Sequence, residues 1–381
     1  MKKVLGCIGI ILLALLAAIV IVWGKEIGTV SNVHQVGDNP YLYEMEYRAS
    51  YDLDKLLAAD VDGNAALVGY VLSTLTKGIP VSIKVPTATE NAGNPAADLP
   101  QEHCTSFQAV NAEGGWLFGR NYDFFKSPTL VVHSHPKDGY SSVSVCDLSH
   151  LGYKTDKLPV DFKSKLLCIA SVYAPMDGMN EKGLCTSIMA LPKQAAVQNT
   201  GKHIAGTSIL MRLWLDRCAT VEEALALLET VDVRHDVKAG SGYHYMIADA
   251  TGDCAVVEFD LNDNWRTLVT RKAPESKYMH VTNHLLAQKY YTEEPDPVYG
   301  NPHSKSWMRY AKVRDYMESH NGGVITADEA AECLSEVHWT ELKWDNGLIE
   351  STQYSNVYDQ TGLTLSLHPW NDYDNSYLFG L

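Results

Sequence analysis

The sequence predicts a layered α+β fold, in which two β-sheets pack face to face and helices cover their outer surfaces. From residue 104 onward, short apolar runs typical of strands alternate with turn residues. Two capping boxes, Thr220-Val-Glu-Glu223 and Thr326-Ala-Asp-Glu329, each precede an apolar segment of helical character. Blocks of strands separated by helices are typical of sheets stacked against each other.

The individual elements follow from the same patterns, in order along the chain. Runs rich in β-branched and aromatic residues mark the strands. The expected strands are Gly115–Phe118, Thr129–His133, Ser142–Cys146, Leu166–Val172, Leu184–Leu191, Tyr243–Ala248 and Cys254–Phe259. The expected helices are Leu53–Thr76, Thr207–Cys218 and the two segments that follow the capping boxes.

The chain begins with an uninterrupted apolar segment, Val4 to Trp23, preceded by Lys2 and Lys3. A helix of this length spans the hydrocarbon core of a bilayer, which is about 30 Å thick. The lysines favour a cytoplasmic start and an extracytoplasmic remainder. A cleaved secretory signal is the alternative, but the run is long and no small-x-small site follows it. We therefore expect residues 1–24 to be an uncleaved signal anchor, with the catalytic part outside the cytoplasm at the cell membrane, or secreted if the N-terminal segment is cleaved.

Residues 25–103 are expected to form a pro-segment that ends in a proline-rich linker. Three prolines and many small residues lie between residues 85 and 100. Such a composition marks an exposed loop, and exposed loops are where chains are cut. An ordinary interdomain linker would have the same composition. The catalytic domain is expected to cover residues 104–381.

Composition excludes some functions. The 381-residue chain has a net charge of −15, which disfavours a nucleic-acid partner because no basic surplus is present to neutralise phosphates. Eight cysteines are scattered without a CxxC pair, and no dinucleotide or P-loop motif occurs. His133 and His135 share one face of a strand but lack a carboxylate or thiolate close in sequence, a weak pattern for a metal site. We expect no metal and no cofactor. The oligomeric state stays open, a homo-oligomer included.

The most informative chemical feature is Cys104, which is followed by Arg120 and Asp123 across the turn Glu113-Gly-Gly115. This spacing predicts a β-hairpin whose two ends bring the thiol, the guanidinium and the carboxylate together. A neighbouring cation activates a thiol as a nucleophile. The alternative is a cysteine that simply packs in a buried strand.

Several motifs, in order, resemble the choloylglycine hydrolase family of N-terminal-nucleophile hydrolases. They are CTSF from Cys104, FGRNYDF with Arg120 and Asp123, DGMNEKGL with Asn180, VTNH with Asn283, SWMRYAKV with Arg309, and the closing hairpin YSNVYDQTGLTLSL. The family includes bile salt hydrolases, penicillin V acylases and the acid-ceramidase-like amidases. The resemblance implies a four-layer αββα sandwich. It also implies oxyanion-hole roles for Asn180 and Asn283 and an active-site role for Arg309.

The resemblance implies a definite chemistry. Cleavage between His103 and Cys104 would free an α-amine with a pKa near 8, which can accept the thiol proton. Arg120 would stabilise the thiolate and Asp123 would orient the amine. The thiol would then attack a linear, non-peptide amide to give an acyl-enzyme that water hydrolyses. Acyl transfer to an amine, and a surface-anchored binding protein that never processes, stay open as alternatives. The long segment before Cys104 resembles the ceramidase-like amidases, which puts bile salts and penicillin V in doubt as substrates.

Overall fold

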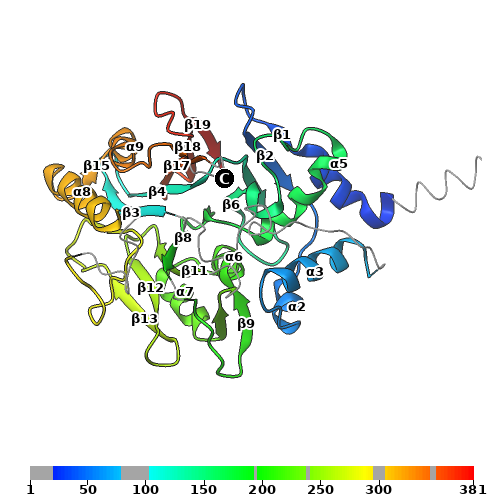
Figure 1. Ribbon diagram of the computed structural model, residues 1–381, viewed down its shortest axis with the longest axis horizontal. Helices are drawn as coiled ribbons and strands as arrows, with labels where there is room; N and C mark the ends of the chain where they lie inside the picture. Colours follow the sequence, from blue (N-terminus) through cyan, green and yellow to red (C-terminus); the bar gives the residue numbers. More distant parts are fainter. Residues whose placement is uncertain (1–19, 79–102, 193–194, 237–240, 295–304, 344–348) are drawn as a thin grey trace, which may run out of the picture.

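The structure, a computed structural model, describes residues 20–78, 103–192, 195–236, 241–294, 305–343 and 349–381. Two β-sheets stack on each other between two layers of helices (Figure 1). The helices α6 (Thr207–Arg217) and α7 (Val221–Leu228) pack on one sheet, and α8 (Ser306–Ser319) and α9 (Ala327–Glu336) pack on the other. The predicted αββα arrangement is therefore present in the described part of the chain.

The first sheet has nine strands among the described residues, in the order β1-β2-β5-β6-β7-β8-β11-β12-β13. Its strands are β1 (His34–Gln35), β2 (Leu42–Tyr47), β5 (Thr129–Ser134), β6 (Ser142–Asp147), β7 (Asp177–Asn180), β8 (Cys185–Pro192), β11 (Ser241–Ala248), β12 (Cys254–Asp260) and β13 (Arg266–Arg271). All neighbours are antiparallel except β2 and β5, which pair in parallel. A separate short parallel pair joins β9 (His203–Gly206) to β10 (Val231–Arg234).

The second sheet has eight strands in the described part and contains the hairpin that begins at Cys104. Its central order is β14-β3-β4-β17-β18-β19, with β15 beside β3 and β16 beside β17. The strands are β3 (His103–Asn111), β4 (Trp116–Phe125), β14 (Tyr278–Val281), β15 (Val324–Ile325), β16 (Leu342–Lys343), β17 (Ile349–Asp359), β18 (Thr364–Pro369) and β19 (Tyr377–Gly380). The predicted closing hairpin is β17–β18.

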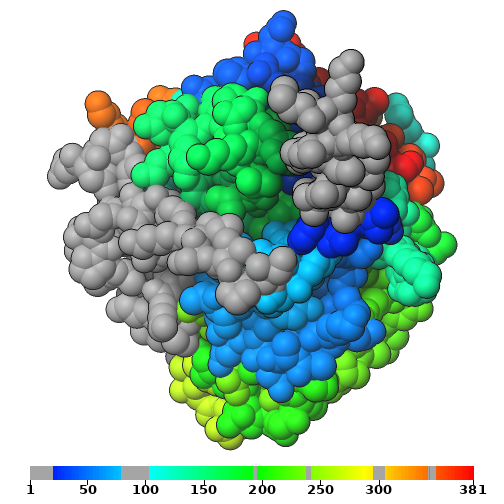
Figure 2. Space-filling model, turned by 90° about the vertical axis from the view of Figure 1, so that its right-hand side faces the viewer, coloured from blue at the N-terminus to red at the C-terminus, as the bar shows by residue number. Residues whose placement is uncertain are grey.

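The segment before Cys104 is built into the fold. Strand β2 pairs in parallel with β5 over its whole length, and its side chains Leu42 and Met45 are fully buried. Two helices, α2 (Leu53–Ala58) and α3 (Asn64–Leu75), follow it. On the face seen in Figure 2, these blue helices lie beside the green segment that contains α5 (Phe162–Lys165). Residues 34–75 thus share the core of the domain that follows them.

Two element predictions were wrong. The run expected as a strand at Leu166–Val172 is the 3₁₀ helix η2 (Leu166–Tyr173), which follows η1 (Leu148–Leu151). A short apolar run fits a buried helix as well as a strand, so its composition could not distinguish them. The single helix expected at Leu53–Thr76 is divided between α2 and α3, because Asp60 and Gly63 adopt positive φ angles of 43° and 80°.

Two other predicted segments fall largely outside the described residues: the apolar run from Val4 to Trp23 and the proline-rich linker. The described remainder of the first segment, residues 20–23, is helical, and the helix continues to residue 32. Within the ranges that the structure describes, no helix is both long and apolar enough to cross a membrane.

Candidate active site

The hairpin of β3 and β4 holds Cys104, Arg120 and Asp123, but on two faces of the sheet: the thiol and the guanidinium share one face and the Asp123 carboxylate lies on the other, so the prediction that all three meet is only partly correct. In its register Cys104 lies opposite Tyr122 and His103 lies opposite Asp123. Side chains alternate along each strand, so neighbouring residues face different layers. Arg120 and Tyr122 point to the nine-stranded sheet, where they bond to Ile188 and Asp147. Asn121, one residue along, bonds instead to α9.

Arg120 is fully buried beside the Cys104 thiol. Its Nη2 donates to the Ile188 carbonyl at 2.6 Å, and its Nε lies 3.8 Å from Oδ2 of Asp177. Burial opposes the charge of Arg120, but Cys104 and Asp177 outweigh burial and hold the pKa of this guanidinium above its ordinary value. Arg120 is therefore a permanent cation next to the thiol.

Asp177 is a site residue that the sequence reading did not single out. It is fully buried, and its carboxylate accepts hydrogen bonds from Tyr354 at 2.7 Å, from Asn356 at 2.6 Å and from Tyr358. Burial raises the pKa of Asp177, while Arg120 and these donors oppose the rise. The residue begins the DGMN segment, but nothing in that motif identifies the arginine as its partner.

Asn283 and Arg309 hold the main chain of Cys104. The Asn283 Oδ1 accepts from the Cys104 N–H at 2.8 Å and from Arg309 Nη2 at 2.7 Å. Arg309 also donates through Nη1 to the carbonyl of Cys104 and, at 2.8 Å, to the hydroxyl of Thr105. Burial lowers the pKa of Arg309, and Asp123 and Cys104 oppose that effect. The structure thus brings Asn283 and Arg309 to Cys104, as the sequence motifs predicted.

Asp123 is fully buried on the side of the sheet that faces α8 and α9. Its Oδ1 accepts from the Thr352 hydroxyl at 2.6 Å, and its buried Oδ2 has no hydrogen-bond partner among the described residues. Burial raises the pKa of Asp123, and Arg309, Thr352, His103 and Arg120 oppose the rise. One acceptor of this carboxylate is therefore available next to the 103–104 peptide.

Asn180 is not brought to the site with the others. Its Nδ2 donates to the carbonyls of Leu215 and Cys218 at 2.9 and 2.7 Å, and its Oδ1 accepts from the N–H groups of Lys182 and Leu184. All its amide hydrogen-bonding capacity is used by backbone at the end of α6 and in the turn after β7. This geometry contradicts the oxyanion role expected for Asn180 and indicates a structural one.

A buried polar network lies behind Asn283, and the sequence reading missed it. The hydroxyl of Ser306, at the start of α8, accepts from the Asn283 N–H at 2.8 Å. The same hydroxyl lies 2.8 Å from Thr282 Oγ1 and 2.8 Å from Nδ1 of His284. Burial lowers the pKa of His284 to about 3, so the ring is neutral. This network fixes Asn283 relative to the helix that carries Arg309.

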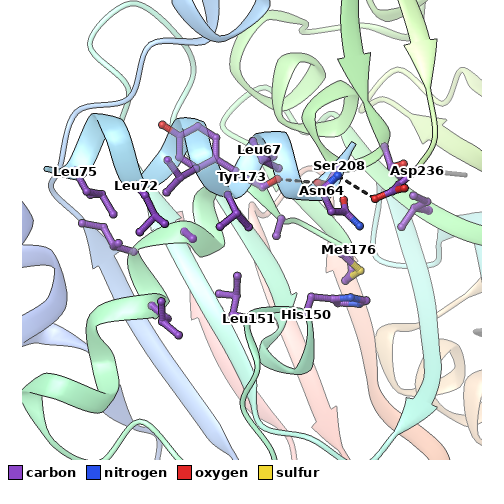
Figure 3. A pocket seen from close by; sticks show the side chains of 18 of the residues that line it. Asn64, Leu67, Leu72, Leu75, His150, Leu151, Tyr173, Met176, Ser208 and Asp236 are labelled. Atoms are coloured by element: carbon purple, nitrogen blue, oxygen red, sulfur yellow. Dashed lines mark hydrogen bonds between the residues drawn. The ribbon is translucent and has the colours of Figure 1, made fainter. Parts of the chain in front are cut away.

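An apolar cavity adjoins the site (Figure 3). Leu67, Leu72 and Leu75 of α3 line one side, and Leu151 and His150 face them from the other. The remaining lining residues are Asn64, Val68, Val71, Leu166, Leu167, Ile169, Ala170, Tyr173, Ala174, Met176, Ile188, Thr207, Ser208, Asp236 and Tyr243.

Two hydrogen-bond contacts connect this cavity to the residues beside the thiol. Ile188 lines the cavity, and its carbonyl accepts a hydrogen bond from Arg120. His150 also lines it, and its Nε2 lies 3.1 Å from the hydroxyl of Tyr122, the cross-strand neighbour of Cys104. One wall of the cavity, α3, comes from the segment that precedes Cys104.

The two histidines considered as a metal pair, His133 on β5 and His135 just after it, contact carboxylates of the neighbouring strand β2. Nε2 of His133 lies 2.9 Å from Glu44, and Nε2 of His135 lies 3.2 Å from Glu46. No group of three or more metal-ligating side chains is positioned to hold a metal ion in the described ranges. The described cysteines, Cys104 included, are all buried, and none of them forms a disulfide with another.

The stacked sheets, the outer helices and a buried cysteine near the start of a central strand define the class of N-terminal-nucleophile folds. The sequence pattern of the acyl-coenzyme A:6-aminopenicillanic acid acyl-transferase family matches residues 110–367, which is more than half of the chain. The protein belongs to this family, and the choloylglycine-hydrolase-like relationship indicated by its motifs is confirmed. The matched range begins after Cys104.

Two solved structures of one hydrolase support the fold. A mutant conjugated bile acid hydrolase from Clostridium perfringens is 18% identical, with a TM-score of 0.50 over 73% of this chain and 92% of that chain. Another variant of the same hydrolase gives the same values. Penicillin V acylase from Agrobacterium tumefaciens is 17% identical, with a TM-score of 0.46 over 73% of this chain and 86% of its own. No curated protein sequence matches the chain significantly.

Proposed function

We propose that the protein is an amidase that cuts itself before Cys104 and then hydrolyses a linear amide through a Cys104 acyl-enzyme. The observation that carries this proposal is the pairing of a buried thiol with a permanent cation, Arg120, on a strand whose main chain is held by Asn283 and Arg309. A cation that faces a thiol favours the thiolate, which is the reactive form.

The contacts of the uncut chain support a role for Asn283 and Asp123 after cleavage. Asn283 Oδ1 already accepts from the nitrogen that would become the α-amine of Cys104. The unpartnered Oδ2 of Asp123 offers that amine a second acceptor. An amine held in this way accepts the thiol proton during attack and returns a proton to the leaving group. We assign both residues to orientation of the amine.

We further propose that the apolar cavity receives the acyl group of the substrate. Its walls are mainly leucine, valine, isoleucine and alanine side chains, and one lining residue, Ile188, accepts a hydrogen bond from Arg120. Burial of an apolar chain there contributes about 0.8 kcal/mol for each methylene group. An amide with a hydrophobic acyl part fits this cavity better than a peptide does.

Full-length protein is expected to be cut between His103 and Cys104, whereas Cys104→Ala is expected to stay intact and inactive. The intact mass, the N-terminal sequence of the larger fragment and amide turnover test both statements. Because β2 pairs with β5, the two fragments should co-elute in gel filtration without denaturant. An active protein with an intact 103–104 bond would refute the proposed mechanism.

The cavity assignment makes a separate prediction. Ala170→Trp places a large ring in the cavity and should lower turnover of amides with long acyl chains about tenfold or more, a cost of about 1.4 kcal/mol. Short acyl amides should be affected less, and self-cleavage should proceed normally. Val269→Trp, at a partly exposed position on β13, is the matched control. Equal losses for short and long chains would contradict the assignment.

Acyl transfer is the second candidate function, and the description of the matched family favours it. The same acyl-enzyme would form, with an amine in place of water as acceptor. Turnover in the presence of added primary amines, with analysis of the products, separates the two reactions.

A further inference from the structure

The residue before the predicted cleavage point has an enclosed binding site of its own. The imidazole of His103 is 6% exposed, and its Nδ1 lies 2.9 Å from Oε1 of Glu350, a side chain that is 1% exposed. The ring of Trp339 lies 4.4 Å from the imidazole at a tilt of 59°. We name Glu350 and Trp339 the His103 cradle.

The 103–104 peptide is therefore held on both of its sides. After the bond, the N–H of Cys104 is fixed by Asn283 and its carbonyl by Arg309. Before the bond, the side chain of His103 is fixed by the cradle. The cradle is also joined to Asp123, because Thr352 exchanges main-chain and side-chain hydrogen bonds with the backbone of Trp339 and donates its hydroxyl to Asp123.

We propose that the His103 cradle is a positioning site that holds the His103 carbonyl in place for self-cleavage. This inference rests on the proposed function. In the step it serves, Cys104 Sγ bonds to the His103 carbonyl carbon and the peptide C–N bond breaks. The thiol proton passes to the nitrogen of Cys104, and a thioester is left. Water then cleaves the thioester to the His103 carboxylate and the free thiol, so that all atoms balance.

The cradle combines a buried carboxylate with an aromatic ring, a pair of groups that packing alone does not require. A buried carboxylate is costly unless a donor or a cation satisfies it, and Nδ1 of His103 lies within ion-pair distance of Oε1 of Glu350, at 2.9 Å. The indole ring of Trp339 beside this carboxylate packs favourably against another planar ring. These two groups therefore recognise an imidazole at the position that precedes the nucleophile, and a displacement of about 1 Å in such a reaction lowers the rate on the order of 100-fold.

The test follows the rate of self-cleavage in the full chain, by mass spectrometry of samples taken during the first hours after refolding or synthesis. We expect His103→Leu, which fills a similar space without a polar group, to be cut at least about tenfold more slowly than the wild type. His103→Asn keeps an amide on residue 103 that can reach Glu350, and it should be cut faster than His103→Leu. Glu350→Gln should be slow as well. Glu341→Gln removes an exposed carboxylate of the same region and is the matched control, with a wild-type rate expected.

Comparison of His103→Asn with His103→Leu distinguishes positioning from structure, because asparagine is the smaller residue and fills the cradle less well than leucine. If His103→Leu is cut at the wild-type rate, or if His103→Asn is no faster than His103→Leu, the cradle is not a positioning site. If Glu350→Gln does not fold, the two His103 variants still decide. If the wild type itself is never cut at this bond, the proposed function fails and the cradle fails with it. If the wild type is cut and the two His103 variants are equally slow, the proposed function stands and the cradle alone fails.

Discussion

Arg309→Met is expected to abolish self-cleavage and to destabilise the protein strongly. Arg309 is 2% exposed and donates to three buried acceptors: the Cys104 carbonyl, the Thr105 hydroxyl and Asn283 Oδ1. Methionine fills a similar volume but donates to none of them, and each unsatisfied buried acceptor costs about 1–3 kcal/mol. A loss of about 3–5 kcal/mol is a large part of the 5–15 kcal/mol typical of a folded domain.

Two further variants make this prediction specific. Arg309→Lys keeps the charge but not the planar fork that reaches three acceptors, so it should also mature slowly. Arg314→Met changes an exposed arginine on the same helix, which bonds only to Asp315 among the residues described, and should mature normally. Urea unfolding reports stability, and mass analysis reports cleavage. Arg309→Met protein that matures like Arg314→Met would show that the Arg309 contacts are dispensable.

Arg120→Gln should raise the pKa of the Cys104 thiol, because it removes the cation that faces it. Each unit of this rise corresponds to about 1.4 kcal/mol of lost preference for the thiolate. The rate of alkylation of mature protein by iodoacetamide, measured against pH with the label located by peptide mass, should move to higher pH. Other thiols interfere little, since burial raises the pKa of Cys168 and of Cys218 to about 12. An unchanged midpoint would refute the electrostatic role of Arg120.

The same substitution leaves Asp177 without its buried counter-charge, so stability should fall as well. Burial already raises the pKa of Asp177, and loss of Arg120 raises it further. The folded state then holds a proton that the unfolded state releases, so the stability of Arg120→Gln should decrease as the pH rises above about 4. Adding Asp177→Asn should remove this pH dependence and recover stability. It should not recover the alkylation midpoint, which separates the two roles of the arginine.

The sequence was most informative where residues close in the chain create the geometry. Strand alternation and one glycine turn are enough to place Cys104, Arg120 and Asp123 on a single hairpin. The capping box at Thr326 forms in full, because its two hydrogen bonds are local. At Thr220 only half of the box forms: the hydroxyl accepts from Glu223, while the Glu223 side chain bonds to Ala219.

Contacts between distant segments were beyond such local reasoning, except for those of Asn283 and Arg309, which the family resemblance supplied. Asn180 was expected near the thiol, yet the carbonyls at the end of α6 hold its amide. Asp177 contacts Arg120 only because the two sheets stack. The sequence of neither strand indicates which residue will lie opposite it in the other sheet. The His103 cradle joins residues more than 200 positions apart. Short-range patterns cannot contain information of this kind.

The parallel pairing of β2 with β5 has a consequence for the proposed cleavage. The two strands lie on opposite sides of the 103–104 bond, so a cut there would convert one chain into two that share a hydrophobic core. Unfolding of the cut protein would separate two molecules, and its midpoint should then rise with protein concentration, as it does for an obligate dimer. Refolding would require two separate chains to associate, which the uncut chain does not need. The lifetime of the cut protein would therefore depend on its unfolding rate more than on its ability to reassemble.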